Sequence, residues 1–141
     1  EELESEFPGI VQGVKFNDYE ALKLLRGPAS ANPFTSTGNV EGLVANRISY
    51  SLGLHGPSMT VNASCAASLI AVHLACQAIR SGECRLAIAG GVQLNLIPDT
   101  AVALSKLGVL SPDGRSRAFD TGASGTIAIW LPVLLTARAP S

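Results

Sequence analysis

The cysteine at position 65 lies in the segment VNASCAASL (residues 61–69), where a short β-like run meets a long apolar helical pattern. At such a position the helix N-terminus lowers the pKa of a thiol, and backbone N–H groups can bind an oxyanion. Ala63 and Ala67 occupy the positions that glycines hold in the nucleophile turn G-x-S-x-G, where small residues allow a sharp turn. The segment alone predicts either a nucleophilic cysteine or, as is more common for this residue, a buried structural one.

No general base for Cys65 can be assigned from the sequence. His73 lies eight residues further along the same helical pattern, about 12 Å away, whereas a hydrogen bond needs about 3 Å. His55 precedes a Gly-Pro pair and is expected to be exposed in a turn. Cys76 is expected to be a core residue of the helix, and Cys84, in the polar turn SGEC, is expected to have no specific role. Three cysteines without a C-x-x-C pair argue against a disulfide framework and against structural zinc.

Strand-like and helical patterns alternate along the chain. Strand patterns cover residues 7–14, 58–63 and 85–91, and the last of these is an apolar run typical of a strand buried on both faces. Helical patterns cover residues 17–27, 40–52, 65–79 and 99–107. Residues 111–125 form a loop by composition. The alternation favours one compact unit of the layered α/β class.

Three details of these helices can be predicted. The helix over residues 40–52 is expected to bury a face made of Leu43, Val44, Ile48 and Leu52. Asp99 is expected to cap the helix that follows it. The helix over residues 65–79 has only three polar side chains, so we expect it inside a layered structure rather than on its surface.

The composition of the chain excludes some classes of function. It has 141 residues, 47% of them apolar and 15% charged, which is enough apolar material for the core of one domain. The net charge is −1 and the basic residues are scattered, so no surface for nucleic acid or an anionic membrane is expected. The longest apolar segment, residues 127–135, is far shorter than the roughly 20 residues of a membrane-spanning helix. The acidic N-terminus is unlike a signal peptide, and a cytoplasmic location is expected.

Two long stretches resemble the ketosynthase domain of modular polyketide synthases, in the β-ketoacyl synthase family of the thiolase fold. They read GNVEGLVANRISYSLGLHGPSMTVNASCAASLIAVHLACQAIRSGECRLAIAGGV and LSPDGRSRAFD. The resemblance runs from about Phe34 to Asp120, and residues 1–33 fit more loosely. It implies an α/β, thiolase-like fold with a layered sheet and a buried central helix. Residues 1–141 are expected to be a partial domain, a fragment of its N-terminal half, with an apolar face left exposed and prone to aggregation.

The nucleophile motif of that family has the form D-T-A-C-S-S-S-L, which residues 62–69 match as N-A-S-C-A-A-S-L. The resemblance implies that Cys65 is the nucleophile and that its backbone N–H is one donor of the oxyanion hole. In such enzymes the thiolate accepts an acyl chain from the phosphopantetheine arm of an acyl carrier protein. The chain then passes to a carbanion made by decarboxylating a malonyl-type extender. Asn62 in place of Asp, and Ala66 and Ala67 in place of Ser, change local hydrogen bonding without replacing the nucleophile.

The resemblance also implies partners. It implies no bound cofactor, an acyl carrier protein that presents the substrate, and a homodimer in which the strand MTVN (residues 59–62) pairs with its copy. After Asp120 the family continues through a glycine-rich segment, and residues 121–141 depart from this pattern, for which a shifted reading frame or a degenerate gene is the expected explanation. The family's two histidines and lysine for decarboxylation lie downstream and have no match in this chain. Little or no catalysis is therefore expected from the chain alone.

Three functions are open at this point. The leading one is a fragment of a polyketide-type β-ketoacyl synthase, an acyltransferase that catalyses acyl transfer to Cys65 and then decarboxylative Claisen condensation. The alternative is a non-catalytic remnant or dimerisation fragment of such a domain. A third is another thiolase-fold acyltransferase, such as a chain-initiating synthase, although LSPDGRSRAFD favours the modular type.

Overall fold

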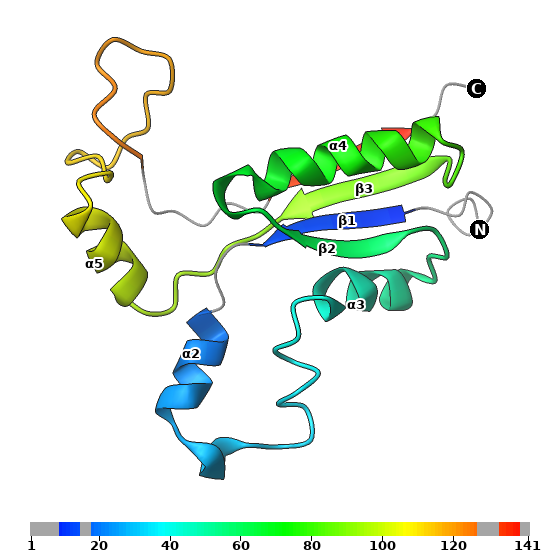
Figure 1. Cartoon of the computed structure of the whole chain (residues 1–141), viewed down its shortest axis with the longest axis horizontal. Coiled ribbons are helices and arrows are strands. Elements are labelled where there is room, and N and C mark those ends of the chain that lie inside the picture. The colour runs from blue at the N-terminus through cyan, green and yellow to red at the C-terminus, as the bar shows by residue number, and fades with distance from the viewer. Residues whose placement is uncertain (1–8, 15–17, 127–132, 139–141) are drawn as a thin grey trace.

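The computed structural model describes residues 9–14, 18–126 and 133–138 (Figure 1). The strands in this part of the chain are β1 (Gly9–Val14), β2 (Ser58–Asn62), β3 (Leu86–Gly91) and β4 (Val133–Arg138). The helices are α2 (Asp18–Leu25), α3 (Leu43–Leu52), α4 (Ala67–Arg80) and α5 (Asp99–Lys106), with short 3₁₀ turns η1 (Pro28–Ser30) and η2 (Ser64–Ala66). The strand and helix patterns of the sequence are confirmed to within three residues, and β4 was not foreseen. Residues 7–8 and Asn17 lie outside the described residues.

The strands form one sheet in the order β2-β1-β3-β4. β1 pairs in parallel with β2 and β3, whereas β4 runs antiparallel to β3. The register pairs Val14 with Asn62 and Gly13 with Gly91, so the three parallel strands end at one edge of the sheet. At this edge Gly91, the last residue of β3, also pairs with Val133, the first residue of β4. The chain therefore leaves the sheet after β3 and returns to it at the same edge.

Helices cover both faces of the sheet, as expected for the α/β class. α3 contacts β1 and β2, α4 contacts β1 and β3, and the two helices lie on opposite sides of the sheet (Figure 1). Parallel strands need such crossover connections, because a tight turn can join only antiparallel neighbours. α2 and α5 lie away from the sheet, beyond the edge at which the parallel strands end (Figure 1).

Small side chains set the distance between α4 and the sheet. The buried residues of α4 are all alanines: Ala67, Ala71, Ala75 and Ala78. The last three share a core cluster with two alanines of β3, Ala87 and Ala89. Because the buried residues on both sides are small, the backbones of helix and strand can lie close together, and larger apolar side chains such as Leu74 and Ile79 pack around this contact.

Cys84 belongs to the same core, so the expectation that it has no specific role was wrong. Its side chain is buried, and an added Cβ on Gly9 of β1 would lie 3.4 Å from Sγ. The chain folds back under α4 at this point, because the N–H of Cys84 donates a hydrogen bond to the carbonyl of Ala78. Burial raises the pKa of the Cys84 thiol, which therefore stays protonated at neutral pH and packs as a small apolar group.

α3 buries a different face from the predicted one. Its buried residues are Ala45 and Ser49. Both are bonded to β2: the N–H of Ala45 donates to Thr60 Oγ1 at 3.3 Å, and Ser49 Oγ donates to Ser58 Oγ at 2.7 Å. The larger residues of the predicted face are half-buried or exposed (Leu43, Val44, Ile48 and Leu52). Hydrophobic periodicity misplaced this face because polar side chains of β2 hold α3 through small and hydroxyl residues.

The described residues cover α4 on its sheet side only. Leu69 is 77% exposed on the outer side, and His73 and Gln77 are not buried either. The helical pattern alone predicted a helix inside a layered structure. In the part of the chain that the structure describes, the outer face of α4 is in contact with solvent instead, as expected for a partial domain with an exposed apolar face. No helix in these described ranges is both long and apolar enough to cross a membrane.

Acidic residues open α2 and α5, with different roles. Asp18 of α2 is buried, and its Oδ2 accepts the N–H groups of Leu96 (2.9 Å) and Ile97 (3.4 Å), which ties α2 to the segment before α5. Asp99 is the first residue of α5, and no side-chain hydrogen bond caps that helix, so the predicted cap was wrong. Periodicity could not reveal the role of Asp18, because its partners lie 78 and 79 residues away.

The Asp18 contact predicts a loss of stability on its removal. In Asp18→Ala the N–H groups of Leu96 and Ile97 lose their acceptor, and we expect the free energy of unfolding to fall by about 1–3 kcal/mol. Urea unfolding followed by circular dichroism measures the change. Asp18→Asn keeps one carbonyl oxygen and should lose less. Equal midpoints for Asp18→Ala and the parent chain would contradict this anchoring role.

Candidate active site

Cys65 lies where the chain leaves the sheet at the carboxyl end of β2. β2 ends at Asn62, η2 covers Ser64–Ala66, and α4 begins at Ala67 (Figure 1). The side chain of Cys65 is exposed. The structure thus places this thiol directly ahead of a helix N-terminus, at the edge where the three parallel strands end, and outside the buried core.

Short-range hydrogen bonds hold the turn that carries Cys65. The N–H of Ser64 donates to Asn62 Oδ1 at 3.4 Å, and the N–H of Ala66 donates to the carbonyl of Ala63 at 3.1 Å. Asn62, which differs from the aspartate of the family motif, still provides an oxygen that accepts a backbone N–H. Ser64 has a φ of 51°, a left-handed conformation that costs a non-glycine residue roughly 1–3 kcal/mol. The turn is sharp, and local bonds together with the packing of α4 maintain it.

One contact in this turn was missed from the sequence. Ser64 Oγ lies 3.9 Å from Cys65 Sγ and is oriented as a hydrogen-bond donor to the sulfur. The only signal in the sequence was a hydroxyl residue directly before the cysteine. Such a signal is weak, because a serine side chain reaches its neighbour only in particular backbone conformations.

Neither histidine is brought to Cys65. His55 precedes β2 whereas Cys65 follows its other end, and a strand of five residues spans about 16 Å. His73 lies on α4, two helical turns beyond Cys65. Within the described ranges, no group of three or more His, Cys, Asp or Glu side chains is placed to hold a metal ion. The described residues therefore supply a thiol and a helix N-terminus, without a histidine base beside them.

Asp113 organises the loop LSPDGRSRAFD (residues 110–120). Its carboxylate accepts hydrogen bonds from Ser111 Oγ at 2.6 Å and from the N–H of Arg115 at 3.2 Å, and it forms an ion pair with Arg117. These contacts, with that from Ser111 first, hold the pKa of Asp113 below its usual range. A segment that is a loop by composition is thus ordered by side-chain bonds.

The bonds to Asp113 predict a loop that is sensitive to acid. The pKa of Asp113 is lower in the folded chain than its usual value of 3.8. The bonds to its carboxylate therefore stabilise the folded loop fully above pH 3.8, and this stabilisation is lost as the pH falls through the lowered pKa. Ser111→Ala should raise the pKa of Asp113 toward 3.8, as measured by NMR titration of its carboxyl carbon. Ser116→Ala, a control in the same loop, should leave the midpoint unchanged. An unaltered midpoint in Ser111→Ala would show that Ser111 does not set this pKa.

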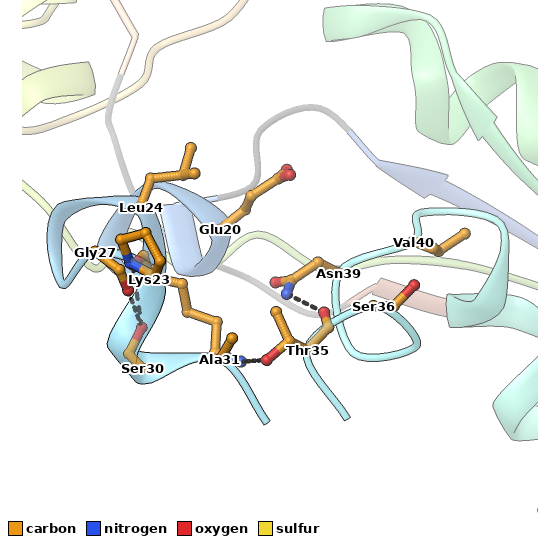
Figure 2. Close-up of a pocket in the computed structure, with 11 residues that line it drawn as sticks. Glu20, Lys23, Leu24, Gly27, Ser30, Ala31, Thr35, Ser36, Asn39 and Val40 are labelled. Atoms are coloured by element: carbon orange, nitrogen blue, oxygen red, sulfur yellow. Dashed lines mark hydrogen bonds between the residues drawn. The ribbon is translucent and has the colours of Figure 1, made fainter. Parts of the chain in front are cut away.

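A separate pocket of about 440 Å³ lies between α2 and the loop that follows it (Figure 2). Lys23 reaches across from α2, and its Nζ donates to Thr35 Oγ1 at 3.0 Å. Asn39 Nδ2 donates to the carbonyl of Thr35 in the same wall. Cys65 is not among the residues that line the pocket. The pocket is therefore formed by bonds that fold the loop onto α2, and it does not extend the site at Cys65.

Comparison with known protein families identifies the class. Residues 1–128 match the model of the family described as "Beta-ketoacyl synthase, N-terminal domain". The match covers most of the chain, and this chain belongs to the β-ketoacyl synthase family, whose members are condensing transferases. The resemblance seen in the sequence is confirmed. The departure expected over residues 121–141 stays a prediction.

Similar proteins narrow the assignment to the polyketide type. The chain is 46% identical over 118 residues to one component of the phenolphthiocerol/phthiocerol polyketide synthase of Mycobacterium tuberculosis, covering 84% of this chain and 8% of that protein. It is 45% identical over 127 residues to probable polyketide synthase 1 of Dictyostelium discoideum, covering 90% of this chain and 4% of that protein. The chain thus spans less than a tenth of the length of these relatives.

Solved structures give the same result for the fold. An oxazolomycin ketosynthase domain of Streptomyces albus matches with a TM-score of 0.78 and 36% identity, over 97% of this chain and 23% of that one. The ketosynthase from module 6 of the bacillaene synthase of Bacillus subtilis matches with a TM-score of 0.74 and 33% identity, over 94% of this chain and 22% of that one. The fold is thiolase-like, and the chain corresponds to part of a polyketide-type ketosynthase domain.

The environments of the three cysteines predict different thiol reactivities. Cys65 is exposed, Cys76 is half-buried, and Cys84 is buried with a raised pKa. We expect iodoacetamide at neutral pH to alkylate Cys65 at least about tenfold faster than Cys76, and Cys84 slowest of all. Peptide mapping by mass spectrometry measures the three rates. Alkylation of Cys76 at the rate of Cys65 would contradict the placement of Cys65 at an accessible helix start.

Proposed function

We propose that this chain provides the acyl-accepting part of a polyketide ketosynthase, with Cys65 as the nucleophile. The observation that carries the proposal is the exposed thiol directly before α4, within a segment that matches the family's nucleophile motif. A helix N-terminus favours the thiolate, which is the nucleophilic form.

The proposed reaction is a thioester exchange. The Cys65 thiol gives its proton to solvent, and the thiolate attacks the carbonyl carbon of an acyl-pantetheine thioester. A carbon–sulfur bond forms, and the carbonyl oxygen becomes an oxyanion. When the oxyanion collapses, the bond from carbon to the pantetheine sulfur breaks. The pantetheine thiolate leaves and takes up a proton, and the acyl chain remains on Cys65.

The backbone N–H of Cys65 is the proposed donor to the oxyanion. It belongs to the same residue as the nucleophile, so it moves with the reacting sulfur, and it lies at the positive end of the α4 dipole. The transfer of negative charge from sulfur to oxygen during attack is favourable at this position. An acyl carrier protein is the proposed donor, because its pantetheine arm can bring the thioester to the exposed edge of the sheet.

Decarboxylative condensation with a malonyl-type extender is proposed for the complete domain. This second step needs groups that handle the carboxylate and the proton, and the described residues place neither histidine beside Cys65. We therefore assign acyl transfer to this chain and leave the condensation step to the assembled enzyme.

A homodimer through β2 is part of the same proposal. In the strand order β2 is the outermost strand of the sheet: β1 pairs with it on one side, and no further strand among the described residues lies on the other. An edge strand offers unpaired N–H and C=O groups to a second chain. Pairing of β2 with its copy would place the two Cys65 turns near the dimer axis, because each turn follows β2 directly.

Acylation of Cys65 tests the proposed function. The 141-residue chain is incubated with butyryl-pantetheine, and intact-protein mass spectrometry detects the adduct. We expect one butyryl group per chain, reduced at least about tenfold in Cys65→Ala, because the nucleophile is gone. Cys76→Ala is the matched control and should retain the adduct.

Two results would contradict the proposal. One is an adduct that persists in Cys65→Ala. The other is a Cys65 that is alkylated rapidly by iodoacetamide but takes no acyl group, which would favour the non-catalytic alternative. That alternative draws its support from the lack of a histidine near Cys65 among the described residues.

A further inference from the structure

The serine before the nucleophile combines two unusual features. Its φ of 51° is uncommon for a residue with a side chain, and its Oγ lies 3.9 Å from Cys65 Sγ, within reach of a hydrogen bond to sulfur. The N–H of Ser64 is in turn held by Asn62 Oδ1. The hydroxyl thus lies beside the sulfur in a turn whose backbone is held by Asn62.

We propose that Ser64 is a positioning residue for Cys65, whose hydroxyl donates a hydrogen bond to the sulfur and stabilises it as the thiolate. This inference rests on the proposed function, and it adds a side chain to a site so far described by its sulfur and its backbone. The family motif D-T-A-C-S-S-S-L has alanine at this position, so the hydroxyl is a feature of this chain that the motif does not require.

The effect of the hydroxyl follows from the charge on sulfur. A neutral thiol is a weak acceptor, whereas hydrogen bonds to an ionised group are shorter and stronger. The bond therefore lowers the free energy of the thiolate more than that of the thiol. Once the sulfur carries an acyl group it has no charge, so the hydrogen bond weakens. The hydroxyl therefore stabilises the thiolate more than the acylated cysteine.

The residues close to Cys65 in the sequence are uncharged. Between residues 56 and 72 the sequence contains no Asp, Glu, Lys, Arg or His, so Cys65 is the titratable side chain of this segment. His73, the next titratable residue on α4, is about 12 Å away along the helix. The helix N-terminus acts on the thiolate in every Ser64 variant, so it does not obscure a difference between them.

Ser64→Ala separates the hydroxyl from the backbone strain. Alanine pays the same cost as serine at positive φ, so this variant removes the hydroxyl and leaves the backbone requirement unchanged. Ser64→Gly removes the hydroxyl and also relieves the strain. If the hydroxyl acts as proposed, both variants raise the pKa of the Cys65 thiol. Relief of backbone strain alone would change this pKa only in the glycine variant.

The pH dependence of alkylation at Cys65 tests the inference. The rate of modification by iodoacetamide is measured between about pH 5 and 10 by peptide mapping, with circular dichroism to confirm the fold. We expect the midpoint of the profile to rise by about 0.5–1 pH unit in Ser64→Ala and in Ser64→Gly. Ser68→Ala, which removes an exposed hydroxyl from the first turn of α4, should leave the midpoint unchanged. If Ser64→Ala loses helical signal, an unchanged midpoint in Ser64→Gly still overturns the inference, since glycine accommodates the positive φ.

The outcomes separate this inference from the proposed function. An unchanged midpoint in both Ser64 variants overturns the inference, even where Cys65 still accepts the butyryl group. A raised midpoint in a chain that takes no butyryl group supports the hydroxyl contact and removes the acyl-transfer function. A midpoint that rises only in Ser64→Gly assigns the effect to the backbone and overturns the role of the hydroxyl.

Discussion

The close contact between α4 and the sheet is the constraint on which the rest of the structure depends. Ala71, Ala75 and Ala78 share a core cluster with the alanines of β3, and the buried residues of this contact are all small. Overpacking such a contact by one or two methylene groups costs about 1–3 kcal/mol. The contact therefore determines where the helix begins, and with it the position of the thiol two residues before α4. The site depends on shape more than on buried area, because alanines contribute little apolar surface.

The turn at Cys65 can be understood as a consequence of that placement. β2 and α4 are both fixed by packing, so the few residues between them must change direction abruptly. Ser64 adopts a left-handed backbone conformation, and its N–H donates a hydrogen bond to Asn62 Oδ1. The strain is local, while the contacts that offset it are spread along the helix. A strained residue beside an exposed nucleophile is a recurrent arrangement at functional sites.

The sequence predicted those parts of the structure that depend on local pattern. The strands β1, β2 and β3, the helix start near Cys65 and the family assignment followed from apolar runs, small residues and a motif, and they are confirmed. The role of Cys65 stays a prediction. The errors concern residues whose environment is set by distant segments. Cys84 is buried by β1 and α4, although its neighbours in sequence are polar. α3 turns Ala45 and Ser49 inward because of hydroxyl groups on β2, which no periodicity of α3 itself could indicate.

The pairing of Gly91 with Val133 determines how freely the segment between β3 and β4 can vary. The 41 residues between them, 92–132, begin and end at adjacent points of the sheet, on the edge that carries Cys65. Both ends of this excursion are anchored by strand pairing. Substitutions or changes of length between residues 92 and 126 can therefore leave the ladder between β3 and β4 intact. The length of this segment can vary more freely than that of the turn at Cys65, which joins β2 to α4 through only four residues, 63–66.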